Sequence, residues 1–107
     1  MIDRCSLKAD FAAISQGKRL NGPILWMMFA PDPNISNPRV AFAFNRKIGN
    51  AVYRNLLRRR IKSCLNDKGM SIRTGRYLIG SRRNARSITY SQICEDMSLL
   101  LARAENV

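Results

Sequence analysis

The spacing of apolar residues along this chain predicts three helices and three strands in one small domain, residues 1–107. Apolar side chains recurring every three or four residues indicate helices over residues 8–16, 50–66 and 89–104. Apolar or alternating runs indicate strands over residues 24–30, 39–45 and 76–81. Turn-forming residues separate these segments. The order of elements predicts an α+β sandwich, with helices laid on a sheet.

The segment over residues 39–45 alternates large and small side chains. Val40, Phe42 and Phe44 share one face of the expected strand, and smaller residues share the other. This pattern predicts one packed face and one open face. Because a loop connects this segment to the strand over residues 24–30, we expect the two strands to pair antiparallel.

The helix over residues 50–66 has two distinct halves. Plotted at about 100° per residue, its basic and amide side chains gather on one half. These side chains are Arg54, Asn55, Arg58, Arg59 and Lys62. The other half is apolar and includes Val52, which we expect to be buried. Arg60 falls among the apolar positions, where it either extends to solvent at an edge or marks a shallow contact.

The turn before this helix is a second basic feature. Gly49 and Asn50 carry the chain from strand into helix, and Arg46 and Lys47 precede them. Unpaired backbone amides at a helix start, with cations beside them, favour binding of an anion. A plain tight turn at Gly49 is compatible with the same residues.

The charge of the chain is concentrated in its middle. The net charge is +12, from 19 Lys+Arg and 7 Asp+Glu. Residues 33–94 carry 14 basic residues against one acid, a net of +13, while the rest of the chain carries five against six, a net of −1. Such an excess opposes compactness and indicates a polyanionic partner. Arginine outnumbers lysine on the basic helix, which favours bidentate contact with phosphate.

Nucleic acid is the partner that these features favour, and alternatives remain open. An ordinary solvated helix would interleave acids among its bases, and this helix has none. A structural RNA-binding module, such as a ribosomal protein or an RNA chaperone, would carry the same charge. A DNA-binding protein would insert the helix into a major groove, and a membrane-surface protein would need its apolar half for lipid.

The sequence offers little for protein-based catalysis. It has no histidine, and Glu95 and Asp96 are expected to face solvent, so neither histidine chemistry nor a metal held by protein side chains is predicted. The cysteines at positions 5, 64 and 94 are interpreted as three reduced thiols that pack as small apolar residues. The longest apolar run is too short for a bilayer, and we expect a cytoplasmic location.

The segment NRKIGNAVYRNLLRRRIKS, which ends at Ser63, resembles the hallmark of the protein subunit of bacterial ribonuclease P. That hallmark runs roughly Lys-Lys-x-Gly-Asn-Ala-Val-x-Arg-Asn-Arg-x-Lys-Arg. The residues that match or substitute conservatively are Arg46, Lys47, Gly49, Asn50, Ala51, Val52, Arg54, Asn55, Arg58 and Arg59. The resemblance covers nearly the whole chain, including the Asp10-Phe11 pair and the strand before Arg82.

This resemblance implies a particular fold. The order of elements would be α-β-β-β-α-β-α on a mixed four-stranded sheet, with a short additional strand near residues 19–21. The basic helix would lie within a left-handed β-α-β crossover, contrary to the usual right-handed preference.

The resemblance also implies a function. In the family, the RNA subunit carries the active site and uses Mg²⁺ to hydrolyse a phosphodiester, removing the 5′ leader from precursor tRNA. The protein contacts the leader in a cleft between the sheet and the first helix, and its basic helix lies against the catalytic RNA. The expected partners are the ribonuclease P RNA, in a one-to-one complex with a monomeric protein, and precursor tRNA. Neither DNA nor a membrane is expected.

The basic half of the helix, the open strand face and the resemblance together assign residues to two RNA-binding surfaces, and none of these residues is expected to be catalytic. For the catalytic RNA they are Arg46, Lys47, Asn50, Arg54, Asn55, Arg58, Arg59 and Lys62. For the leader cleft they are Phe11, Trp26, Met28, Phe42, Phe44 and Arg82, with Phe42 or Phe44 depending on which strand face is open. Aromatic rings in a basic groove suit single-stranded RNA, and core packing is an equal alternative for Phe11 and Trp26.

The chain departs from the family pattern at four positions. Leu56 replaces an arginine of the hallmark, and Arg60 stands where an apolar residue is usual. Ser15 and Met28 replace aromatic residues, so we expect weaker stacking of the leader. Arg60 either compensates for Leu56 or is incidental.

Overall fold

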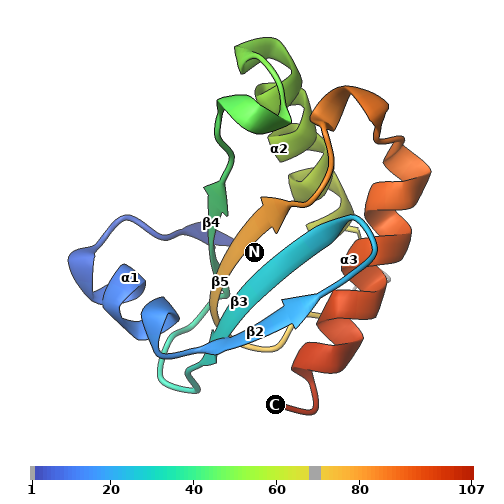
Figure 1. Ribbon diagram of the computed structural model, residues 1–107. Coiled ribbons are helices and arrows are strands. Elements are labelled where there is room, and N and C mark those ends of the chain that lie inside the picture. The colour runs from blue at the N-terminus through green and yellow to red at the C-terminus, as the bar shows by residue number, and fades with distance from the viewer. Residues whose placement is uncertain (1, 68–70) are drawn as a thin grey trace.

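The computed structural model describes residues 2–67 and 71–107 and contains a five-stranded sheet flanked by helices (Figure 1). The strands are β1 (Asp3–Arg4), β2 (Lys18–Asn21), β3 (Leu25–Pro31), β4 (Arg39–Ala43) and β5 (Gly75–Ser81). The helices are α1 (Lys8–Ser15), α2 (Ala51–Leu65) and α3 (Tyr90–Ala104), with short 3-10 helices η1 (Arg46–Ile48) and η2 (Ala85–Ser87). The six elements predicted from apolar spacing are confirmed to within two residues, and β2 is the additional strand that the resemblance implied. Within the described ranges, no helix has the length and hydropathy needed to cross a bilayer.

The strand order is β1-β4-β5-β3-β2, which corrects two expectations. The sheet has five strands rather than four, because β1 pairs in parallel with β4. β3 and β4 do not pair with each other, because β5 lies between them, antiparallel to β3 and parallel to β4. The long proline-rich loop after β3 has the length to pass the intervening strand. β4, α2 and β5 therefore form a β-α-β unit.

One face of the sheet forms the core with α2 and α3. Leu25, Met27 and Phe29 of β3 alternate inward, and Tyr77 and Ile79 of β5 lie beside them in register. The rings of Phe29 and Tyr77 stack with their centres 4.5 Å apart. Apolar faces of both helices cover this layer, so their polar faces are directed outward.

Asp96 is buried, contrary to the expectation that it faces solvent. Its carboxylate accepts hydrogen bonds from the backbone amides of Ile24 (3.1 Å) and Leu25 (2.6 Å), which lie at the start of β3. A Cβ at Gly22 would lie 2.6 Å from the same carboxylate, so a glycine is required there. Asp96 thus ties α3 to the sheet.

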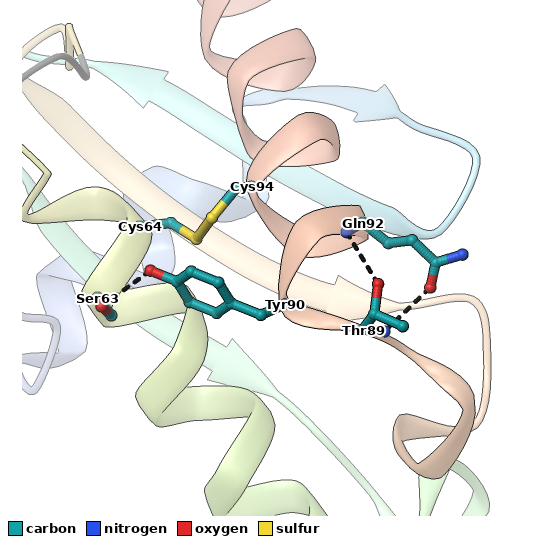
Figure 2. Close-up of a disulfide and its surroundings, with 6 residues drawn as sticks. All are labelled: Ser63, Cys64, Thr89, Tyr90, Gln92 and Cys94. Atoms are coloured by element: carbon teal, nitrogen blue, oxygen red, sulfur yellow. Dashed lines mark hydrogen bonds between the residues drawn. A yellow bond between two sulfur atoms is a disulfide. The ribbon is translucent and has the colours of Figure 1, made fainter.

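Cys64 and Cys94 form a disulfide between α2 and α3, so the expectation of three reduced thiols is wrong for this pair (Figure 2). Their Cα atoms are 5.6 Å apart, a separation that a disulfide spans without backbone movement. Beside the disulfide, the hydroxyls of Ser63 and Tyr90 share a hydrogen bond of 3.0 Å. Cys5 is a buried free thiol, as expected.

Reducing the disulfide is expected to lower the free energy of unfolding by about 3–4 kcal/mol, because the bridge restricts a loop of roughly 30 residues in the unfolded chain. Urea unfolding with and without dithiothreitol measures this difference. A Cys64→Ala, Cys94→Ala variant should be insensitive to the reductant. Identical unfolding of the unsubstituted protein in both conditions would show that the bridge does not form in solution.

Candidate RNA-binding surface

The turn into α2 is shaped by one glycine and one asparagine. Gly49 has a φ of 144°, a conformation that side chains disfavour. Asn50 is the N-cap of α2, and its side-chain oxygen accepts a hydrogen bond from the amide of Tyr53 (3.1 Å). Arg46 and Lys47 are exposed beside this turn. The capping role of Asn50 is therefore established, whereas its contact with RNA stays a prediction.

The outer face of α2 carries the basic stripe predicted from the sequence. Asn55, Arg59 and Lys62 are exposed, and Arg54 and Arg58 are half-buried. The side-chain oxygen of Asn55 accepts a hydrogen bond from Arg58 Nη1 at 2.6 Å and so orients its guanidinium. The buried Nε atom of Arg54 finds no hydrogen-bond partner in the part of the chain that the structure describes.

Val52 contradicts the expectation of burial, since 71% of its surface is exposed. It lies in a shallow hollow on α2 together with Arg58, Arg59 and Lys62. On the helix, Val52 lies next to Arg59, at the boundary between the basic half and the apolar half. The core covers the opposite side of the apolar half and leaves this boundary exposed. The basic stripe therefore includes one exposed apolar side chain.

A groove of about 580 Å³ runs beside the second half of α2. Phe11 of α1, Phe42 of β4, and Arg58 and Lys62 of α2 line it. Its other lining residues are Ile2, Asp3, Arg4, Cys5, Val40, Ala41 and Asn66. The Arg58 guanidinium lies 5.8 Å from the ring centre of Phe42 and 5.9 Å from that of Phe44, within cation–π range. The groove is therefore lined both by aromatic rings and by cations that also belong to the basic stripe.

Trp26 and Met28 lie on the opposite face of the sheet from Phe42. They alternate with the buried residues of β3, whereas Phe42 shares the face that packs against α2 and α3. A Cβ at Gly80 would lie 2.1 Å from the indole of Trp26, and the Arg19 guanidinium lies 4.5 Å from the indole centre on the outside. The residues predicted for the leader cleft therefore do not form one cluster, because the sheet separates Trp26 and Met28 from Phe42.

Arg82 is also outside the groove. Its guanidinium donates a hydrogen bond to the carbonyl of Gly22 at 3.0 Å, which attaches it to the turn between β2 and β3. The sequence analysis missed two arginines that lie closer than Arg82 to the predicted aromatic residues. Arg4 lines the groove, and Arg19 covers Trp26. No motif marks them, since only the pairing of β1 and β2 with the sheet brings them there.

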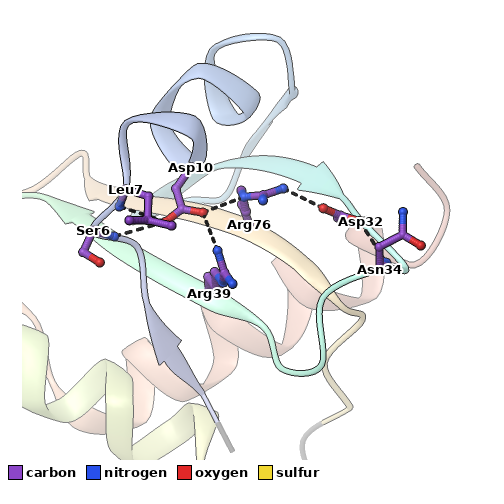
Figure 3. Close-up of polar contacts among 7 residues, drawn as sticks. All are labelled: Ser6, Leu7, Asp10, Asp32, Asn34, Arg39 and Arg76. Carbon is purple, nitrogen blue, oxygen red and sulfur yellow. Dashed lines mark hydrogen bonds and ion pairs between the residues drawn. The ribbon is translucent and has the colours of Figure 1, made fainter.

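Asp10 fixes α1 on the sheet (Figure 3). Its carboxylate is 1% exposed, pairs with Arg39 (2.9 Å) and Arg76 (2.8 Å), and accepts hydrogen bonds from two backbone amides at the start of α1. Arg39 and Arg76 lie directly opposite each other in the β4–β5 register. The hydrogen bond from Arg76 holds the pKa of Asp10 well below its usual range, against the opposing effect of burial. Because α1 is fixed, the neighbouring Phe11 is held at the groove.

Arg60 points away from the basic stripe. Its Nη1 donates a hydrogen bond to the carbonyl of Ile88, just after η2, at 3.3 Å. The guanidinium is thus used within the fold, which favours a structural role over compensation for Leu56.

Residues 3–105 match the protein-family model described as Ribonuclease P. The chain belongs to the ribonuclease P protein family. The ribonuclease P protein component of Brucella melitensis is 33% identical over 106 residues, covering 89% of this chain and 74% of the relative. That of a Picosynechococcus species is 34% identical over 99 residues, covering 90% and 84%.

Two solved structures share the fold. The RNase P protein of Staphylococcus aureus superposes with a TM-score of 0.82 at 24% identity, covering 95% of this chain and 94% of that one. The RNase P protein of Thermotoga maritima gives 0.79 at 23% identity, covering 94% and 96%. With the family match, the chain is a protein subunit of ribonuclease P, an enzyme of tRNA processing, and a general RNA-binding protein is not favoured.

Asp10→Asn is expected to destabilise the fold by about 3–5 kcal/mol at neutral pH, because it leaves two arginines without their buried counter-charge. The folded-state pKa is lowered, so the stability that Asp10 supplies is present above its unfolded pKa of about 3.9 and is lost as the pH falls toward the folded value. Urea unfolding from pH 7 into the acid range measures both effects. Asp3→Asn, at an exposed carboxylate, is the matched control. Equal stability of both variants at pH 7 would show that Asp10 does not hold α1 on the sheet through Arg39 and Arg76.

Arg60→Leu is expected to leave the salt dependence of RNA binding unchanged and to cost about 1 kcal/mol of stability through loss of its hydrogen bond. Arg59→Leu, at the preceding residue, which is exposed on the stripe, should reduce the salt slope by about one phosphate contact. The slope of log K against log salt compares the two variants. A reduced slope for Arg60→Leu would support compensation for Leu56 instead.

Proposed function

We propose that the protein works in the cytoplasm as a monomer in a one-to-one complex with an RNA subunit that carries the active site. Together they would remove the 5′ leader from precursor tRNA. The observation that carries this proposal is that Arg58 and Lys62 belong both to the basic stripe and to the aromatic groove. One helix can therefore neutralise the phosphates of two RNA segments where they converge.

The stripe suits the folded RNA subunit. Its guanidinium groups offer planar, paired donors that match phosphate oxygens, and Asn55 holds Arg58 in one orientation. The exposed side chain of Val52 adds an apolar contact among these cations. Because α2 is anchored by its buried half, little ordering is needed on binding.

The groove suits the single-stranded leader. The ring of Phe11 is 46% exposed, which favours base stacking over core packing for this residue. Phe42 and the cations of α2 supply a second ring and phosphate contacts in the same groove. At Trp26, a base would first have to displace Arg19, so that face is the weaker candidate.

The two buried carboxylates, Asp10 and Asp96, do not suit a Mg²⁺ site. Asp10 is committed to two arginines and Asp96 to two backbone amides. Residues 2–67 and 71–107 contain no cluster of three side chains able to hold a metal ion. We therefore assign the Mg²⁺ that the family requires to the RNA, and the protein contributes by reducing phosphate repulsion around the cleavage site.

Cleavage of a 5′-extended precursor tRNA by a bacterial ribonuclease P RNA at low Mg²⁺ tests this function. We expect strong stimulation by the protein and its loss in an Arg54→Ala, Arg58→Ala variant, because both changes remove phosphate contacts.

Phe11→Ala should reduce affinity for a leader-bearing substrate by about tenfold, as loss of one stacked base predicts. The affinity for a substrate without a leader should be unchanged.

Arg103→Ala is the control, because Arg103 lies on the last turn of α3 and lines neither the groove nor the hollow on α2. Its guanidinium donates a hydrogen bond to the Asn21 carbonyl at 2.6 Å, so circular dichroism checks that the variant keeps its fold. Tight RNA binding without any stimulation of cleavage would leave only a general RNA-binding module and would overturn the proposal.

A further inference from the structure

The connection between β5 and α3 brings one more cation to the start of α2. Within it, the Cβ of Ala85 lies 3.7 Å from where a Cβ of Gly49 would be, so η2 packs against the turn that opens α2. The Arg86 guanidinium lies over the ring of Tyr53, with 5.5 Å between the guanidinium carbon and the ring centre. Arg86 is exposed, as are Arg46 and Lys47 of η1.

This connection is held rigidly although it is a loop. Ala85 and Ile88 are only 7% and 3% exposed, which anchors both ends of η2 in the core. The side-chain oxygen of Asn84 accepts a hydrogen bond from the Arg86 amide at 2.9 Å. Arg60 of α2 binds the Ile88 carbonyl from the other side. Arg86 is therefore presented from a fixed backbone, and its side chain is further restrained by Tyr53.

We propose that Arg86, stacked on Tyr53, contacts the RNA subunit and extends the basic stripe around the start of α2. This inference rests on the proposed function. The RNA subunit is the partner rather than the leader, because the groove lies along the other end of α2. The helix rises about 14 Å from Tyr53, which contacts Arg86, to Lys62, which lines the groove, so Arg86 and the groove lie at different ends of α2. The connection between β5 and α3 runs beside α2 in Figure 1. It contacts Tyr53 and Arg60, on the side of α2 away from the stripe, so Arg86 would reach the RNA from the other side of the start of α2.

Binding of a ribonuclease P RNA without tRNA, measured over a range of salt concentrations, tests this contact. Arg86→Ala is expected to raise Kd about three- to tenfold and to reduce the salt slope by about one phosphate contact. Arg86→Lys should keep the slope but lose part of the affinity, because lysine lacks the planar group that stacks. Arg103→Ala, at another exposed arginine, should change neither quantity.

The outcomes separate this inference from the proposed function. Arg58→Ala is measured in the same assay as a variant of the stripe. If Arg58→Ala weakens binding while Arg86→Ala behaves like Arg103→Ala, the inference is wrong and the proposed function stands. If neither Arg58→Ala nor Arg86→Ala weakens binding, both fail. Circular dichroism of each variant confirms that the fold is retained before binding is compared.

Discussion

The arrangement of the site depends on one buried carboxylate. Arg39 and Arg76 face each other across the central parallel pair of strands, where two like charges would repel. Asp10 lies between them, and Arg76 continues to Asp32 in the loop after β3 at 2.7 Å. The network joins α1, β4, β5 and that loop, which are far apart in sequence. It therefore determines where Phe11 lies relative to α2, and hence the shape of the groove.

The arginines of this chain serve two purposes, and their partners distinguish them. Arg39 and Arg76 pair with carboxylates, while Arg60 and Arg73 donate to backbone carbonyls, the latter at the end of α3. Others are presented outward by neighbouring polar or aromatic side chains, as Arg58 is by Asn55. Guanidinium suits both purposes because it offers several fixed donors and stacks on rings. A net charge of +12 is thus partly structural and partly available to a polyanion.

Apolar periodicity predicted every long element because each buries one face against the sheet or a neighbouring helix, and burial imposes a period of two or 3.6 residues. The same reasoning identified the basic half of α2, where polar side chains fall opposite the buried ones. It was wrong for Val52, which lies at the boundary of the two halves, and for Asp96, whose burial depends on two amides of β3. The periodicity of a helix or strand predicts on which side of that element a residue lies. It does not predict which other part of the chain packs against that side.

By itself, then, the sequence determined the elements, the basic stripe and the family, since these depend on local spacing and on one contiguous motif. Only the tertiary structure decided that β5 separates β3 from β4, that Cys64 meets Cys94, and that Trp26 and Met28 lie on the opposite face of the sheet from Phe42. Each of these follows from how segments remote in sequence pack together. Their relative placement is set by the core and by the Asp10 network, and no local pattern encodes it.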